Sequence, residues 1–239
     1  MVFLCFAVKD RMPLVNDFYQ FLINFGLDVW YDRRNIFLGD DRYATNICKG
    51  AADPKIKYAV VLYSDNFRTG NICLEEYKVL VERYQSEGLV IFPIFLNDVP
   101  EKMAGGYELC KKLVYKELRS HEDFLPIALH IIAKVTCDEL SNSPYKSIQD
   151  VLVHYREKNS CAYRLLVEYE NISKEHYAMR IAMLYAIYSI LAANNRQKYL
   201  HFKTVSYLYH QCCIAPLREE KRELQIFENI VTQEFGSAL

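Results

Sequence analysis

The sequence predicts an α/β domain with a mainly parallel five-stranded sheet, covered by helices on both faces and followed by an all-helical region. Over about the first 136 residues, short apolar runs alternate with longer segments of helical period. Beyond Asp138, apolar residues recur at helical spacing instead. Alternating strands and helices form parallel sheets with helices on both faces. We therefore expect two domains, at residues 1–137 and 138–239.

Five apolar segments are expected to form the strands. The continuous apolar run Val2–Val8 suits a strand that is buried on both faces. The others are expected at Asp28–Tyr31, Tyr58–Tyr63, Val90–Leu96 and Leu113–Tyr115. Together these five segments provide the strands of a five-stranded open sheet.

Helices are expected between these strands and after the last. Asp10 can cap the first helix, and Gly26 is placed to end it. The other helices are expected at Arg42–Gly50, Cys73–Ser86 and Phe124–Val135, with polar loops at Asp32–Asp41 and Ser64–Asn71. The stretch from Asp138 to Ser147 carries Ser, Asn and Pro, which are typical of a connector.

A ligand site is expected where the carboxyl ends of the strands meet. In open sheets of this kind, strand order reverses beside the first strand and ligands bind at that point. Glu75 and Glu76 lie there, at the start of the third helix, where the helix dipole stabilises a carboxylate. From position alone, the favoured interpretation is that both simply offset that dipole on a solvated face.

Composition argues against several classes of partner. The net charge of −1 gives no reason to expect nucleic acid or an anionic membrane surface. The apolar segment Ile181–Ala193 is shorter than the roughly 20 residues that a bilayer span needs. Eight scattered cysteines without a signal peptide fit reduced thiols in a cytoplasmic protein.

Sequence motifs for common cofactor and metal sites are missing. The chain contains no GxxxxGK or GxGxxG phosphate loop and no GxSxG nucleophile elbow. Its six histidines show neither HxxxH nor HExxH spacing, so no metal site is expected. A phospho-acceptor receiver would need several acids after the first strand, but Asp10 stands there beside Lys9.

Six segments occur in a characteristic order along the first part of the chain. They are Phe3–Asp10, Gly26–Asp32, Ile36–Asp40, Val60–Phe67, Ile72–Glu76 and Val90–Phe95. In this order they resemble the opening box, second strand, BB-loop tip, third strand, aromatic-Cys-x-x-Glu segment and fourth strand of TIR (Toll/interleukin-1 receptor-like) domains. The resemblance covers about residues 1–136 and implies a flavodoxin-like sheet flanked by helices.

The resemblance also implies an activity. Prokaryotic, plant and some animal members of the family cleave NAD+ at the nicotinamide–ribosyl bond. The glutamate that ends the aromatic-Cys-x-x-Glu segment carries that activity, and here it is Glu76, since Glu75 stands one place too early. The chain would then be an NAD+ nucleosidase (EC 3.2.2 type) that releases nicotinamide and ADP-ribose or a cyclic ADP-ribose-derived signal. Such proteins act in antiphage and innate immune defence, with NAD+ as substrate and no cofactor.

Residues that would line the substrate site follow from the same positions. They are Phe6, Ala7, Asp32, Gly39, Asp40, Ser64 and Ile72. Some positions depart from the family pattern. Cys5 stands where serine is usual, Leu38 replaces the BB-loop proline, and Ile72 stands where NAD-cleaving members often have tryptophan.

An alternative is a non-catalytic signalling module that works by assembly. The BB loop Asp32–Asp41 and the helical region would then supply the contacts. Under either hypothesis a homo-oligomer is expected, formed through TIR–TIR contacts and the helical region, with an effector or sensor protein as a further partner. Nothing in the sequence of residues 138–239 identifies a ligand.

Overall fold

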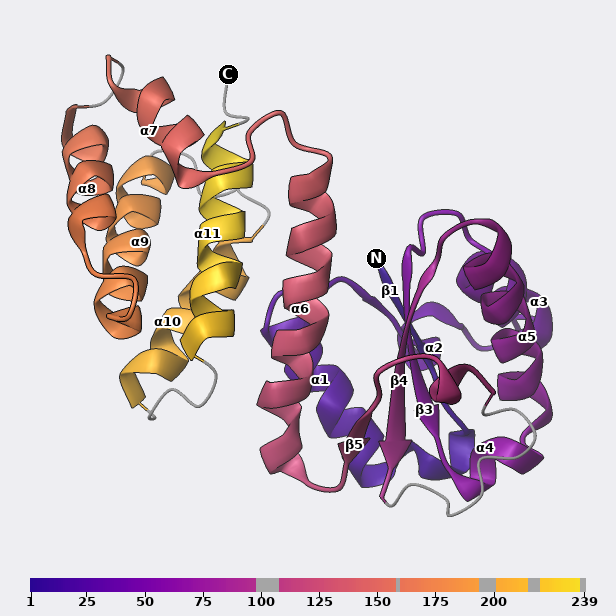
Figure 1. Ribbon diagram of the computed structural model, residues 1–239. Helices are drawn as coiled ribbons and strands as arrows, with labels where there is room; N and C mark the ends of the chain where they lie inside the picture. The colour runs from indigo at the N-terminus through magenta and orange to yellow at the C-terminus, as the bar shows by residue number, and fades with distance from the viewer. Residues whose placement is uncertain (98–107, 158–159, 194–200, 215–219, 237–239) are drawn as a thin grey trace. The chain divides into compact units, whose positions relative to one another are not determined.

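The computed structural model describes residues 1–97, 108–157, 160–193, 201–214 and 220–236 (Figure 1). The chain divides into two compact units, Met1–Ile23 with Leu27–Ile127 and Asn24–Gly26 with Ala128–Leu239. The first unit contains a five-stranded sheet with helices, and the described residues of the second form helices. The predicted order of an α/β fold followed by an all-α region is therefore confirmed.

All five strands of the sheet run parallel. They are β1 (Val2–Cys5), β2 (Val29–Trp30), β3 (Tyr58–Tyr63), β4 (Val90–Leu96) and β5 (Lys116–Leu118). Their order is β2-β1-β3-β4-β5, so the strand order reverses beside β1 as predicted. In the register of the sheet, Phe3 lies beside Trp30 on one side and beside Ala59 on the other.

Two strand boundaries differ from the prediction. The fifth strand is not at Leu113–Tyr115, because the Leu113 amide donates to the carbonyl of Leu109 and continues a helical turn there. The strand begins after that turn, at Lys116. β1 ends at Cys5 instead of Val8, because the chain turns at η1 (Val8–Asp10), where the Asp10 amide donates to the Ala7 carbonyl.

Helices and helical turns connect the strands of the first unit. The helices are α1 (Asn16–Asn24), α2 (Asp32–Asn35), α3 (Arg42–Asn46), α4 (Asp65–Thr69) and α5 (Asn71–Ser86). α6 (Phe124–Ser141) follows β5, and its residues from Ala128 onward belong to the second unit. The shorter turns are η2 (Arg11–Val15), η3 (Ile47–Ala51), η4 (Glu108–Lys111) and η5 (His121–Asp123). α2 and α4 lie inside the two segments predicted to be loops, and α6 continues past Val135 to Ser141.

The first helix begins later than predicted. Met12 has extended backbone angles (φ −111°, ψ 141°), as expected of a residue that precedes a proline, here Pro13. Regular α-helix therefore starts only at Asn16. Asp10 does not cap this helix through its side chain, which instead accepts hydrogen bonds from Ser64 and Asn66.

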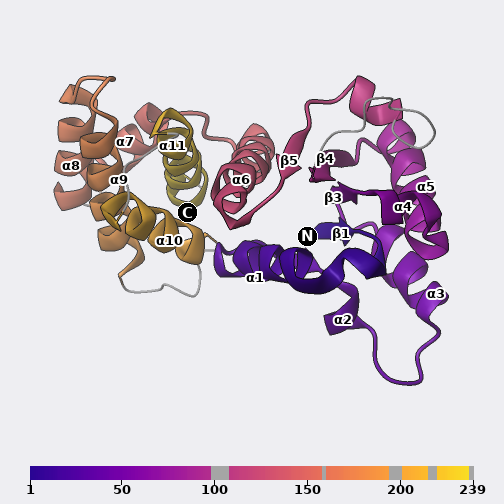
Figure 2. The same cartoon turned by 90° about the horizontal axis from the view of Figure 1, so that it is seen from below.

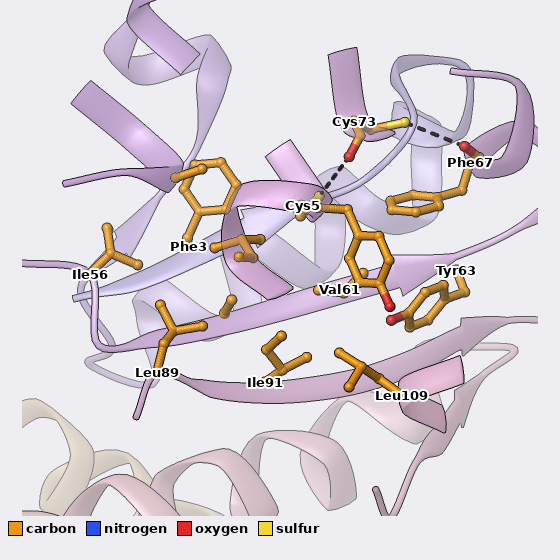
Figure 3. Packing of buried hydrophobic residues seen from close by; sticks show 14 of the residues in the cluster. Phe3, Cys5, Ile56, Val61, Tyr63, Phe67, Cys73, Leu89, Ile91 and Leu109 are labelled. Carbon is orange, nitrogen blue, oxygen red and sulfur yellow. Dashed lines mark hydrogen bonds between the residues drawn. The ribbon is translucent and has the colours of Figure 1, made fainter. Parts of the chain in front are cut away.

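The two faces of the sheet are covered by different helices (Figures 1 and 2). α3 and α5 lie on one face, over a cluster of buried residues that includes Phe3, Val61 and Ile91 (Figure 3). α1 and the first turn of α6 lie on the other face, where the rings of Phe18 and Phe124 are 5.2 Å apart. The parallel strands are thus buried on both faces, as their continuous apolar runs predict.

The second unit contains α7 (Ile148–Tyr155), α8 (Ser160–Asn171), α9 (Tyr177–Ala192), α10 (Phe202–Ile214) and α11 (Glu220–Gly236). The buried side chain of Arg180 on α9 joins three of these helices. It donates to the carbonyls of Tyr169 and Ile172 at the end of α8, and to Glu228 of α11. Among the described residues, no helix has the length and hydropathy needed to cross a membrane.

Close packing of η3 on the sheet requires a glycine at position 50. A Cβ atom on Gly50 would lie 2.7 Å from Cε2 of Phe3 and 3.1 Å from the ring of Trp30. Real Cβ atoms do not approach other atoms that closely, and both rings are buried. The missing side chain therefore allows the end of α3 and the whole of η3 to lie against β1 and β2.

We expect Gly50→Ala to lower the free energy of unfolding by about 1–3 kcal/mol, because the added methyl overpacks two buried rings. Urea unfolding followed by the fluorescence of Trp30, the single tryptophan of the chain, measures this change. Cys48→Ala, at an exposed position of the same turn, is the control and should stay within about 0.5 kcal/mol. An unchanged midpoint for Gly50→Ala would contradict the packing described.

Candidate active site

A cavity of about 340 Å³ opens at the carboxyl end of β1, beside the start of α5. Its lining comprises Leu4, Phe6, Ala7, Val8, Lys9, Trp30, Asp32, Arg42, Asn46, Asn66, Thr69, Gly70, Asn71, Ile72, Cys73 and Glu76. All of these residues belong to the α/β unit. The cavity therefore lies at the strand-order reversal, where a ligand site was expected.

Glu76 carries one of the two buried carboxyl groups of this cavity; Asp32 carries the other. Glu76 lies near the start of α5 and only 6% of its surface is exposed. Its Oε2 accepts a hydrogen bond from the Cys5 thiol at 3.5 Å. Burial raises the pKa of Glu76 to about 8, while the Cys5 hydrogen bond and the positive charge of Arg42 act in the opposite direction.

Glu75 has different surroundings. Its side chain is 41% exposed and forms an ion pair with Lys78, with 2.6 Å between the charged atoms. Glu75 is absent from the cavity lining. The helix thus directs one of the two neighbouring carboxyl groups into the cavity and the other into solvent, a distinction that position along the helix could not make.

The two cysteines beside Glu76 are held as thiols. Burial raises the pKa of Cys5 well above its usual value, and burial raises that of Cys73 to about 11. The Cys73 thiol donates to the carbonyls of Gly70 and Phe67, and Cys5 also lies 3.6 Å from the Cys73 carbonyl (Figure 3). Neither thiol therefore competes with Glu76 as a negatively charged group at neutral pH.

Asp32 is buried in the cavity lining, inside a network of cations. It is paired with Arg11, and an Arg42 nitrogen lies 3.9 Å from the same carboxylate. The Arg11 guanidinium lies 5.5 Å from the ring centre of Phe6, on which it stacks. With Arg11 paired to Asp32, Arg42 and Lys9 add further positive charge to the cavity lining.

A second carboxylate fixes the segment that follows β3. Asp10 accepts hydrogen bonds from the Ser64 hydroxyl and from Nδ2 of Asn66, the latter at 2.6 Å. The Ser64 hydroxyl in turn accepts from the Phe67 amide and so caps α4. This network holds Asn66 at the cavity wall.

The structure brings together five of the eight residues predicted for the site. Phe6, Ala7, Asp32, Ile72 and Glu76 line the cavity, whereas Gly39, Asp40 and Ser64 do not. Gly39 and Asp40 belong to an exposed turn, in which the Asp40 carboxylate accepts from the Phe37 amide at 2.9 Å. Ser64 serves as the cap of α4. A role for these three in binding stays a prediction.

Eleven of the sixteen lining residues were not predicted from the sequence, and Lys9, Trp30, Arg42 and Asn46 are among them. The spacing of Arg42 and Asn46, four positions apart on a predicted helix, places both on one face. That spacing was the available signal, although this helix was not assigned to the site from the sequence. No sequence pattern shows that Trp30, in a buried strand, also reaches the cavity.

Within the described part of the chain, no group of three or more His, Cys, Asp and Glu side chains is arranged to hold a metal ion. The cavity lining instead combines two buried carboxyl groups, those of Asp32 and Glu76, with cations at the mouth and with several amide side chains. Such a set suits an organic ligand that carries both hydroxyl and anionic groups.

Comparison with known proteins identifies the family to which the α/β part of the chain belongs. A family model described as "TIR domain" matches residues 2–129, which is over half of the chain. The chain therefore belongs to the TIR domain family. Among solved structures, it is similar to the TIR domain of the Toll-related receptor TRR-2 from Hydra magnipapillata, with 20% sequence identity and a TM-score of 0.42. That match covers 56% of this chain and 94% of the Hydra chain.

We expect Glu76→Gln to stabilise the protein in a pH-dependent way. The folded-state pKa of about 8 lies above the ordinary value of 4.5. The protonated carboxyl group of Glu76 therefore contributes stability that is fully present below about pH 4.5 and is lost as the pH rises to about 8. A neutral amide avoids that loss. The free energy of unfolding of the variant at high pH should therefore exceed that of the parent by a few kcal/mol, on the order of 1.4 kcal/mol per pKa unit.

Thermal unfolding at pH 4.5 and pH 8.5 measures this effect. The melting temperature of Glu76→Gln should exceed that of the parent at pH 8.5 and match it at pH 4.5. Glu75→Gln, which changes an exposed carboxylate, is the control and should shift neither value appreciably. An equal shift of Glu76→Gln at both pH values would show that Glu76 is not held in an environment that raises its pKa.

Proposed function

We propose that the chain is an NAD+ nucleosidase, which cleaves the nicotinamide–ribosyl bond to give nicotinamide and ADP-ribose or a cyclic ADP-ribose-derived product. One observation carries the proposal. Of the two buried carboxyl groups that line the cavity, Asp32 is paired with Arg11, whereas Glu76 forms no ion pair among the described residues, and the cations Lys9 and Arg42 lie at the mouth. The family includes both NAD-cleaving members and non-catalytic ones, so the proposal rests on this site.

The chemistry of the leaving group suits a site with one carboxylate. Nicotinamide in NAD+ is cationic at its ring nitrogen and departs as a neutral molecule with the electrons of the broken C–N bond. No general acid is needed to protonate it, unlike the leaving group of ordinary glycoside hydrolysis. The reaction instead needs a negative charge near C1′ of the ribose, where an oxocarbenium-like cation develops.

Glu76 meets that need through its burial. Its pKa of about 8 leaves much of it protonated in the empty cavity at neutral pH. A bound pyridinium cation favours the ionised form, because an opposite charge in a poorly solvated site lowers a carboxyl pKa. The resulting carboxylate stabilises the ribosyl cation and holds the ribose hydroxyl groups. Water then attacks C1′ and loses a proton, or an adenine nitrogen attacks instead and closes a ring.

The remaining charges suit the rest of the dinucleotide. Lys9 is exposed, and the Arg42 side chain is 45% exposed, so both can approach a ligand from the mouth of the cavity. The diphosphate of NAD+ carries negative charge on the side of the ribose away from nicotinamide. Arg42 and Lys9 would therefore bind diphosphate while Glu76 faces C1′.

We place the reaction in the cytoplasm, as part of antiphage or innate immune signalling.

A second candidate function is assembly without catalysis. The turn at the tip of the BB loop exposes two large apolar side chains, Phe37 and Leu38. Exposed apolar residues side by side favour contact with another protein surface. We propose that this turn and the helical unit contribute to a homo-oligomer, which is compatible with catalysis and would be the whole function if the cavity were inactive.

We expect Glu76→Ala to lower the rate of nicotinamide release by about 100-fold or more, because the one carboxylate at the reacting carbon is lost. Glu75→Ala, its matched control, should retain activity. Nicotinamide release from NAD+ by concentrated, assembled protein measures both. Equal activity of the two variants beside an active parent would overturn the assignment of Glu76. A parent that assembles but leaves NAD+ intact would favour the second candidate function.

A further inference from the structure

Asn46 is a buried amide that the fold itself does not use. Only 1% of its surface is exposed, and its side chain forms no hydrogen bond with any residue that the structure describes. Its Oδ1 is buried without a partner in this part of the chain. Buried polar groups are nearly always hydrogen-bonded, so an unpaired buried amide calls for a reason.

The position of Asn46 supplies that reason, because it lines the same cavity as Glu76. It ends α3, one turn after Arg42, so both side chains lie on the face of the helix that borders the cavity. The Asn46 side chain does not cap the following turn η3. Rotation about its last side-chain bond would turn Oδ1 toward the cavity and break no existing hydrogen bond.

The exposure of the lining side chains distinguishes the mouth of the cavity from its base. Arg42 is 45% exposed and lies at the mouth, whereas Asn46 and Trp30 are buried. A volume of about 340 Å³ is near the lower limit for sites of small organic ligands. The cavity therefore suits the nicotinamide ribosyl half of a dinucleotide better than the whole. With phosphate at the mouth and ribose at Glu76, the nicotinamide ring falls at the base.

We propose that the Asn46 amide hydrogen-bonds the carboxamide of nicotinamide and thereby selects NAD+ over its nicotinic-acid analogue; this rests on the proposed NAD+ cleavage. An asparagine side chain offers one acceptor and two donor hydrogens, and a carboxamide offers the same set. Two amides can therefore pair through two hydrogen bonds. A nicotinic-acid ring carries a carboxylate, which donates nothing and leaves Oδ1 of Asn46 unpaired.

The test compares cleavage of NAD+ with cleavage of nicotinic acid adenine dinucleotide by the assembled full chain. The parent should prefer NAD+ by about tenfold or more in kcat/KM. Asn46→Ala and Asn46→Leu should bring that ratio close to one. The leucine variant keeps the number and branching of the side-chain heavy atoms and removes the unpaired amide, so it should remain folded. Asn71→Ala, which removes an exposed amide from the same cavity, should leave the ratio unchanged.

A parent without preference, or a ratio unchanged in both Asn46 variants, would overturn the proposal. Saturation-transfer NMR with nicotinamide and nicotinic acid as probes gives a readout that does not depend on cleavage. A nicotinamide signal in the parent that is lost in Asn46→Leu supports the role of Asn46. No nicotinamide signal in the parent, or equal signals in parent and variant, would contradict it. A parent that binds nicotinamide but cleaves neither dinucleotide would refute the proposed reaction and keep the recognition.

Discussion

The contact between the Cys5 thiol and the Glu76 carboxyl group joins β1, beside which the strand order reverses, to α5, the helix that carries Glu76. A thiol is a weak hydrogen-bond donor, so it compensates only a small part of the cost of burying a carboxylate. The nearest cation that acts on Glu76 is Arg42, which lies at the mouth and forms no ion pair with it among the described residues. The ionised form of Glu76 is therefore poorly stabilised by the protein, and the positive charge of a cationic ligand can stabilise it.

This arrangement depends on the order of the strands. β1 lies between β2 and β3, and all three end at the same edge. The segment after β3 is fixed by Asp10, so α5 starts directly over the end of β1. Gly50 lets η3 approach Phe3 and Trp30, which places the end of α3 on the other side of the cavity. Two helices from different crossovers thus face each other across the carboxyl end of one strand.

The sequence was sufficient to predict the sheet, the strand-order reversal and the family, because continuous apolar runs and ordered motifs depend on local residue patterns. Glu76 could be separated from Glu75 only through the family resemblance, and its burial agrees with that choice. Arg42 and Asn46 could not be assigned, since their role depends on how a short helix lies against α5. The start of the fifth strand was predicted too early, because the Leu113 amide is hydrogen-bonded within a helical turn. Strand propensity does not predict that hydrogen bond.

The central claim is that a desolvated Glu76 must lose its proton for the reaction, and that the substrate cation helps it to do so. The pH dependence of nicotinamide release tests this claim most directly. The pH profile of kcat/KM reports the ionisation of groups in the free enzyme, so kcat/KM should rise with pH through about 8, where Glu76 ionises. The rise in kcat should occur at lower pH, because the bound pyridinium favours the carboxylate. A kcat/KM that stays level or falls between pH 6 and pH 9 would contradict the account.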